Sequence, residues 1–98
     1  IDALPDVPTA AEAGLEGFQI GIWHGLYAPQ GTPEEAIAAL TDALQKALAD
    51  ENVVQRFADL GTAPVSAEEA TPEALKNKLL SEIDRWAPVI NAAGVYAD

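Results

Sequence analysis

The stretch on which the predicted fold depends is residues 18–28, FQIGIWHGLYA. In its first half, apolar side chains alternate with other residues, and aromatic and β-branched residues are frequent. A period of two with these residue types is typical of a β-strand. Gly21 and Gly25 lie inside the stretch, where glycine indicates a bulge or a close approach of another backbone. We therefore predict a strand that ends at Pro29.

A long helix is predicted directly after this strand, over residues 32–50. Thr32 is expected to be its N-cap, with Pro33 at the first helical position and Glu35 completing a capping box. Leucine and isoleucine residues recur every three or four positions along it and predict one apolar face. A shorter helix over residues 52–60 follows, and Gly61 is expected to end it.

In the remaining third of the chain, the sequence predicts a short strand at residues 62–65 and one more long helix. Thr71 and Pro72 repeat the pattern of a cap followed by proline, and Gly94 is the expected end of the helix. Pro88 lies inside and predicts a kink near residues 84–87. Trp86 falls on the apolar face, so we expect it in the core. The residues thus predict an α/β fold with three helices, one main strand and a short second strand.

Composition excludes several classes of function. The chain has 98 residues, of which 49% are hydrophobic, so we expect one small folded unit. Five basic residues against sixteen acidic ones give a net charge of −11. A protein so acidic has no basic surface with which to bind nucleic acid or an anionic membrane. There is no cysteine, which excludes disulfides and thiolate chemistry. The first residue is Ile1 rather than Met, which leads us to expect a piece of a longer chain, with room for a signal peptide upstream.

Few residues carry a chemical signal. His24 is the single histidine. No nucleophile or carboxylate lies at a sequence spacing from it that is typical of a catalytic motif. We therefore interpret it as a half-exposed strand residue. Trp23 has two interpretations, a wall of a ligand cleft or a side chain packed on a helix. Paired carboxylates fall at predicted helix starts, where the helix dipole accounts for them. No catalytic residue, metal site or cofactor is expected.

Several phrases, read in order, resemble one known family. They are Leu4-Pro5-Asp6-Val7-Pro8-Thr9, Glu12-Ala13-Gly14-Leu15, Gly17-Phe18, Trp23-His24-Gly25-Leu26, Ala28-Pro29, Gly31-Thr32-Pro33, Leu60-Gly61, Pro64-Val65, Glu82 to Trp86, Val89-Ile90 and Ala92-Ala93-Gly94-Val95. Together they resemble the C-terminal part of the substrate-binding proteins of tripartite tricarboxylate transporters, the Bug-type receptors.

The resemblance implies a fold and a function. Such receptors are periplasmic and have two α/β lobes that close like a Venus flytrap on a small organic acid, often a carboxylate, which passes to membrane permease subunits. Residues 1–17 would end the second lobe, residues 18–30 would be the crossover strand, and residues 31–98 would form the helical C-terminal part of the first lobe. The resemblance implies ligand-binding roles for Trp23, His24 and Gly25, and hinge roles for Gly21 and Gly25.

Two other functions remain open from the sequence. One is a small acidic α/β module that binds a protein partner through its apolar helix faces. The other is an enzyme fragment with His24 as base, which predicts a carboxylate or serine within hydrogen-bond reach of that residue. The favoured interpretation is the solute receptor. We also expect the isolated chain to self-associate around the segment that contains Trp23, because a strand without neighbours exposes unpaired backbone groups.

Overall fold

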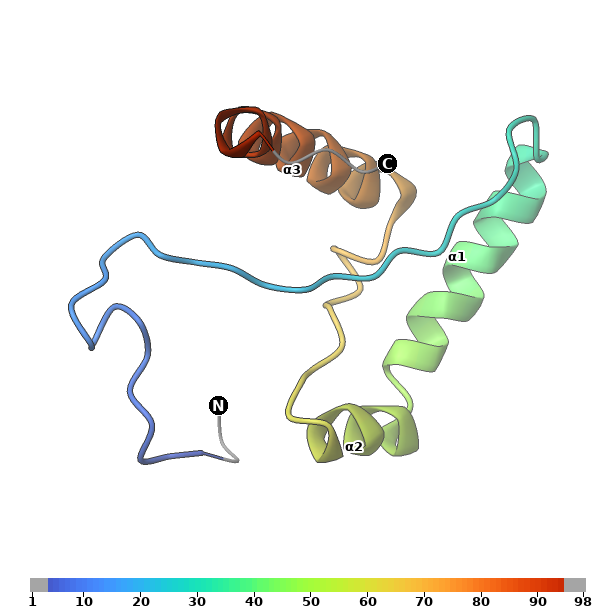
Figure 1. Ribbon diagram of the computed structural model, residues 1–98. Coiled ribbons are helices and arrows are strands. Elements are labelled where there is room, and N and C mark those ends of the chain that lie inside the picture. Colours follow the sequence, from blue (N-terminus) through green and yellow to red (C-terminus); the bar gives the residue numbers. More distant parts are fainter. Residues whose placement is uncertain (1–3, 95–98) are drawn as a thin grey trace.

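The computed structural model describes residues 4–94, and these residues form three helices in chain order (Figure 1). They are α1 (Glu34–Leu48), α2 (Glu51–Asp59) and α3 (Pro72–Ala93). Residues 1–3 and 95–98, which are the outer ends of the predicted units 1–17 and 31–98, lie outside the described residues.

The predicted α/β class is wrong for this structure. No strand or sheet is present within residues 4–94. Residues 18–29 are extended, yet no β-ladder hydrogen bonds join them to another described segment. Residues 62–66, which include the predicted short strand, are also extended without a ladder. The alternation of side chains was read from a local pattern, whereas a strand needs a neighbour to supply its hydrogen bonds.

The long first helix forms where predicted, but its cap differs. Pro33, not Thr32, is the N-cap of α1, and no side chain caps the helix. The Thr32 hydroxyl instead donates to the carbonyl of Pro29 at 2.8 Å and closes the preceding turn. The predicted capping box with Glu35 is therefore wrong. Glu34 and Glu35 still lie in the first turn, where the positive end of the helix dipole favours carboxylates.

Caps account for the ends of the other two helices. The Asp50 carboxylate accepts hydrogen bonds from the backbone N–H groups of Asn52 and Val53 and starts α2. Thr71 is the N-cap of α3, as predicted, and its hydroxyl accepts from the Ala74 N–H at 3.2 Å. Gly94 ends α3 at a φ of 66°, a left-handed conformation that favours glycine.

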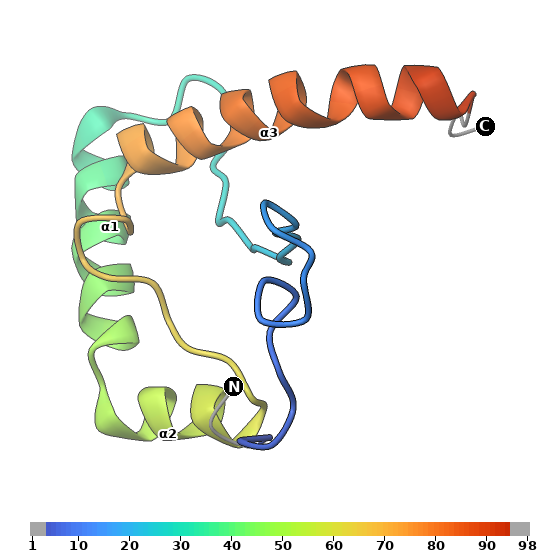
Figure 2. The same cartoon turned by 90° about the vertical axis from the view of Figure 1, so that its left-hand side faces the viewer.

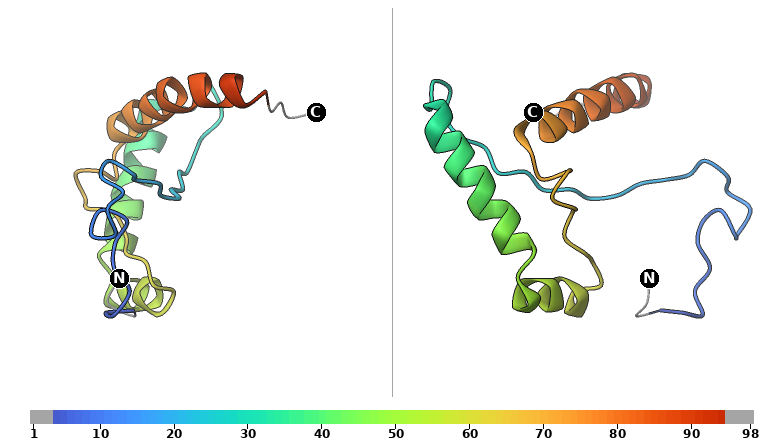
Figure 3. Two further views of the ribbon diagram at one scale, coloured as in Figure 1. Left: turned by 60° about the vertical axis from the view of Figure 1, so that its left-hand side comes forward. Right: turned by 180° about the vertical axis from the view of Figure 1, so that it is seen from behind.

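The three helices and the extended segment form an open arrangement rather than a layered one. Figure 2 shows α3, α1 and α2 as three sides of a C, and both views in Figure 3 show residues 18–29 running from the start of α1 past α3. The radius of gyration is 17.1 Å, whereas a compact domain of this length has one of about 13 Å.

This open shape leaves almost no core. Among the described hydrophobic residues, only Ala70 is buried. Leu40, on the predicted apolar face of α1, is 60% exposed. Trp86 is only half-buried, so its predicted place in a core is wrong within the described residues. Its indole N–H donates to the Glu82 carboxylate at 2.8 Å. The helices are amphipathic, but the structure brings no second layer against their apolar faces.

One side chain fixes the start of α3 against α1. The amide of Gln45, on α1, donates to the carbonyls of Ala67 at 2.9 Å and Ala70 at 3.1 Å. Both acceptors lie in the turn that leads into Thr71 and α3. This contact joins two helices that touch little elsewhere. Across residues 4–94, no helix combines the length and the apolar character that a membrane span requires.

Candidate functional site

The predicted site residues lie on the extended segment. Trp23 and Gly25 are half-buried, whereas His24 between them is exposed. Trp23 lines a recess shared with α3, and Gly25 approaches Leu75 of α3. The structure thus brings Trp23 and Gly25 to α3 and leaves His24 exposed.

Gly25 lies close against α3. A Cβ atom added to Gly25 would stand 2.8 Å and 3.1 Å from the two δ-carbons of Leu75 and 3.1 Å from the Tyr27 ring. A Cβ added to Gly21 would meet nothing within 4 Å. Neither glycine has a positive φ. Gly25 is therefore in close contact with α3, and Gly21 is in open space.

A recess of about 240 Å³ lies between the extended segment and α3. The segment contributes Trp23, Ile22 and the residues around Gly21, and α3 contributes charged side chains. Its lining consists of Gln19, Gly21, Ile22, Trp23, Lys78, Glu82 and Arg85. Lys78 and Arg85 are two of the five basic residues in the chain. The recess therefore places an indole beside two cations and one carboxylate.

Glu82 is the centre of the polar contacts in this recess. Its carboxylate accepts from Lys78 Nζ at 2.9 Å and from the Trp86 indole at 2.8 Å, and Arg85 Nη1 lies 3.9 Å away. The hydrogen bond from Lys78, followed by that from Trp86, holds the pKa of Glu82 below its usual value. Glu82 is therefore charged at neutral pH and offsets one of the two neighbouring cations.

Arg85 connects α3 to the extended segment. Its guanidinium donates a hydrogen bond to the Gln19 carbonyl, and the same group lies 5.2 Å from the centre of the Trp86 ring. Lys78, Glu82 and Arg85 are not predicted from the sequence as partners of Trp23. Two signals were available: the 78–82 spacing, which brings opposite charges together on a helix, and the concentration of three basic residues at positions 76, 78 and 85.

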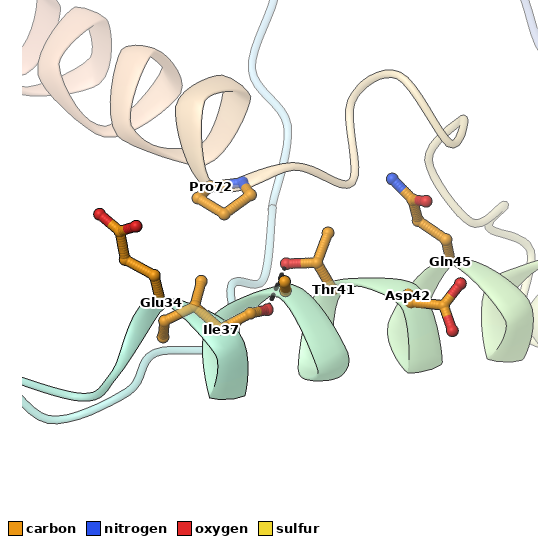
Figure 4. A pocket seen from close by; sticks show the side chains of 7 residues that line it. Glu34, Ile37, Thr41, Asp42, Gln45 and Pro72 are labelled. Carbon is orange, nitrogen blue, oxygen red and sulfur yellow. Dashed lines mark hydrogen bonds between the residues drawn. The ribbon is translucent and has the colours of Figure 1, made fainter.

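A second, wider hollow of about 450 Å³ runs along α1 where α3 begins (Figure 4). Ile37 and Thr41 of α1 face Pro72 of α3 across it, and Glu34 and Asp42 stand at its sides. The Thr41 hydroxyl donates to the Ile37 carbonyl at 2.8 Å, and Asp42 pairs with Lys46 at 2.7 Å. Gln45, which also lines the hollow, donates to the carbonyls of Ala67 and Ala70 before α3. The bonds of Thr41, Asp42 and Gln45 are therefore structural, and no constellation for catalysis is found here among the described residues.

Among the described residues, His24 has no partner of the kind that the enzyme hypothesis requires. The ion pairs of the described residues involve Lys46, Lys78 and Arg85, not His24. Within residues 4–94, no hydrogen bond joins the His24 side chain to a carboxylate or a serine, and no group of three acidic or histidine side chains could hold a metal ion. The role of His24 as a base therefore has no geometric support in this part of the chain.

Comparison with known proteins identifies the family of this chain. The family model described as tripartite tricarboxylate transporter family receptor matches residues 1–95. The chain belongs to this family. The resemblance read from the sequence is thereby confirmed, and the tripartite tricarboxylate transporter receptors are transport receptors, not enzymes.

Curated relatives in three bacteria are similar to this family member. An Agrobacterium vitis protein, named UPF0065 protein in the TAR-I ttuE-ttuC' intergenic region, is 50% identical over 94 residues, which are 96% of this chain and 27% of the relative. The UPF0065 protein in the tcbD-tcbE intergenic region of Pseudomonas sp. strain P51 is 40% identical over 89% of this chain and 25% of its own length. Protein BugT of Bordetella pertussis is 38% identical over 92% of this chain and 27% of its own length.

The match covers only part of each relative. The chain spans about a quarter of the length of the curated relatives it matches. No solved structure gives a significant match.

Proposed function

We propose that this chain is the C-terminal part of a periplasmic solute receptor that captures a small organic acid and delivers it to the permease subunits of a tripartite tricarboxylate transporter. The observation that carries the proposal is the match of the receptor family model to residues 1–95. The identity of 50% to a protein several times longer supports the view that these residues act within a larger receptor.

The recess at Trp23 supports a contribution to the ligand-binding region. Trp23 is half-buried beside Lys78 and Arg85, so an indole and two cations meet at one place. Aromatic surfaces with nearby basic groups suit a small organic carboxylate, because they supply both contact area and charge. The assignments of Trp23, His24 and Gly25 to ligand binding, and of Gly21 and Gly25 to a hinge, stay predictions. So does the division into a second-lobe part (residues 1–17) and a first-lobe part (residues 31–98).

The experiment is a calorimetric titration of the full-length receptor that contains these residues with mono-, di- and tricarboxylates. We expect at least one carboxylate to bind saturably. Its amide analogue, which lacks the negative charge, should not bind. Trp23→Ala is expected to weaken binding at least tenfold. The matched control is Leu80→Ala on α3, a half-exposed position away from the recess. Absence of binding to every carboxylate, by a folded receptor, would contradict the proposal.

A further inference from the structure

The recess between the extended segment and α3 contains a negative charge of its own, that of Glu82. The Glu82 side chain is only 15% exposed, whereas the side chains of Lys78 and Arg85 are 49% and 45% exposed. The two cations are therefore the groups that a ligand from solvent reaches most easily. The carboxylate is sheltered beside them.

Glu82 is held in place by its neighbours on α3. Its Oε1 atom accepts a hydrogen bond from Lys78 Nζ at 2.9 Å, and its Oε2 atom accepts one from the Trp86 indole at 2.8 Å. Lys78 and Trp86 are four positions before and after Glu82, so the three side chains share one face of the helix. A carboxylate bonded at both oxygens is a fixed part of the recess rather than a mobile counter-ion.

The charges that line the recess suit one negative group and no more. Two cations and one carboxylate, on Lys78, Arg85 and Glu82, leave a net charge of +1. One carboxylate of a ligand balances this charge. A second carboxylate at the same place would have no cation left to pair with and would be repelled by Glu82. The net charge of −11 on the whole chain adds to that repulsion.

The size of the recess indicates that it takes one end of a ligand. Its volume is about 240 Å³, whereas pockets that enclose a whole ligand have about 300–1,000 Å³. Trp23 and Ile22 provide apolar surface next to the charged groups. A carboxylate carried on an apolar carbon fits this combination, because its charge meets the cations while its carbon lies on the indole.

We propose that Glu82 is a specificity-determining residue, which restricts the recess to a ligand end with a single negative charge and rejects an end that carries two adjoining carboxylates. The inference rests on the proposed function, in which a small organic acid is captured. Lys78 and Arg85 attract every carboxylate, so they do not discriminate between the two kinds of ligand. Discrimination needs a repulsive element, and Glu82 supplies it.

The test uses pairs of ligands that differ by one carboxylate beside the first: butyrate with ethylmalonate, and benzoate with phthalate. Each is titrated calorimetrically into the full-length receptor that contains these residues. We expect the monocarboxylate of a pair to bind at least about fivefold more tightly, because a like charge about 4 Å away weakens binding by this factor even in bulk water.

Glu82→Gln removes the negative charge at nearly constant size and keeps an acceptor oxygen for Lys78. In this variant the two members of a pair should bind about equally, through tighter binding of the dicarboxylate. The matched control is Asp84→Asn, which removes a carboxylate from an exposed position of α3 outside the recess. Residues two positions apart on a helix do not face one another, so the control should leave the affinity ratio unchanged.

A second variant keeps the inference testable if Glu82→Gln does not fold. Lys78→Gln leaves Glu82 in place and lowers the charge of the recess lining from +1 to zero. We expect it to weaken the binding of butyrate and benzoate at least about fivefold. Unchanged binding of both would place the ligand outside the recess and overturn the inference.

The remaining outcomes separate this inference from the proposed function. An affinity ratio that Glu82→Gln leaves unchanged, or that Asp84→Asn changes equally, would overturn the inference and leave the proposed function intact. The same holds for a receptor that binds other carboxylates but none of the four probes. A folded receptor that binds no carboxylate at all would contradict the proposed function itself, and the inference would fall with it.

Discussion

The Arg85 guanidinium on α3 donates a hydrogen bond to the carbonyl of Gln19, 66 positions earlier in the chain. Among the described residues, it is the side-chain hydrogen bond that joins the positions farthest apart in the sequence. Since residues 18–29 have no ladder partners there, this bond and the close approach of Gly25 to Leu75 hold the segment beside α3.

Replacing Arg85 with alanine should release the extended segment near Gln19. A partly exposed hydrogen bond from a charged group contributes about 1 kcal/mol, which corresponds to an about fivefold larger population of the released segment. NOEs between the Trp23 ring and the side chains of α3 that share its recess should weaken accordingly. Lys76→Ala removes a neighbouring charge on α3 and serves as the control. An Arg85→Ala variant with unchanged NOEs would show that the bond contributes nothing.

The two glycines of the segment should respond differently to valine. Gly25→Val places new methyl groups against the Leu75 side chain, and such overpacking costs about 1–2 kcal/mol even when the neighbour shifts. We expect the NOEs between the residue-25 Hα and the Leu75 methyl groups to weaken or disappear. Gly21→Val has free space and negative φ, so its spectrum should change only locally. Equal effects at both positions would contradict the contact with α3.

Two exposed turns should loosen in acid. The Glu69 carboxylate accepts from the Ser66 N–H at 3.2 Å and from its hydroxyl at 2.9 Å, and the N–H bond is the main reason that the pKa of Glu69 is lowered from 4.5. The pKa of Glu12 is lowered in the same way, first by the Thr9 N–H and then by its hydroxyl.

Because the folded pKa lies below the unfolded one, these bonds stabilise the turns fully above pH 4.5 and are lost as pH falls through the lower folded pKa. The amide proton shifts of Ser66 and Thr9 should therefore titrate with midpoints below 4.5. Glu69→Gln is the control, since it should abolish the Ser66 titration and spare that of Thr9. A Ser66 midpoint above 4.5 would reverse the sign of the argument.

The isolated chain should self-associate, because nothing else covers its apolar surface. Light scattering during gel filtration at micromolar concentration should give a mass above 10.3 kDa. Adding salt should strengthen the association by screening the charge of −11 on each copy. The paired substitution Ile20→Asp and Ile22→Asp should shift the mass towards the monomer. A clean monomer that melts cooperatively would contradict this expectation.

Local sequence signals predicted the three helices. The predictions that failed concern features that depend on contacts with segments distant in the sequence. Thr71 and Pro72 determine the start of α3 by themselves, because a cap needs only the adjacent turn. Thr32 has the same local pattern, yet it binds the Pro29 carbonyl, so the preceding turn competes successfully for its hydroxyl. The prediction of a strand at residues 18–28 required a partner that periodicity cannot identify.

Only part of the candidate site was predicted from the sequence. Trp23 was recognisable as an unusual residue in the extended segment. Its partners Lys78, Glu82 and Arg85 were not recognisable, because their meeting depends on how α3 lies against the segment. Trp86 illustrates the limit for the core: its spacing on α3 indicates an apolar face, but the exposure of that face depends on what lies opposite.

The bridge from Gln45 to the carbonyls of Ala67 and Ala70 has a consequence for the order of folding. It closes loops of 22 and 25 positions, whereas the bond from Arg85 to Gln19 closes one of 66. Closing the longer loop costs about 1 kcal/mol more in chain entropy. The junction of α1 with the start of α3 is therefore expected to form first and to offer a preformed corner, onto which the extended segment is added last.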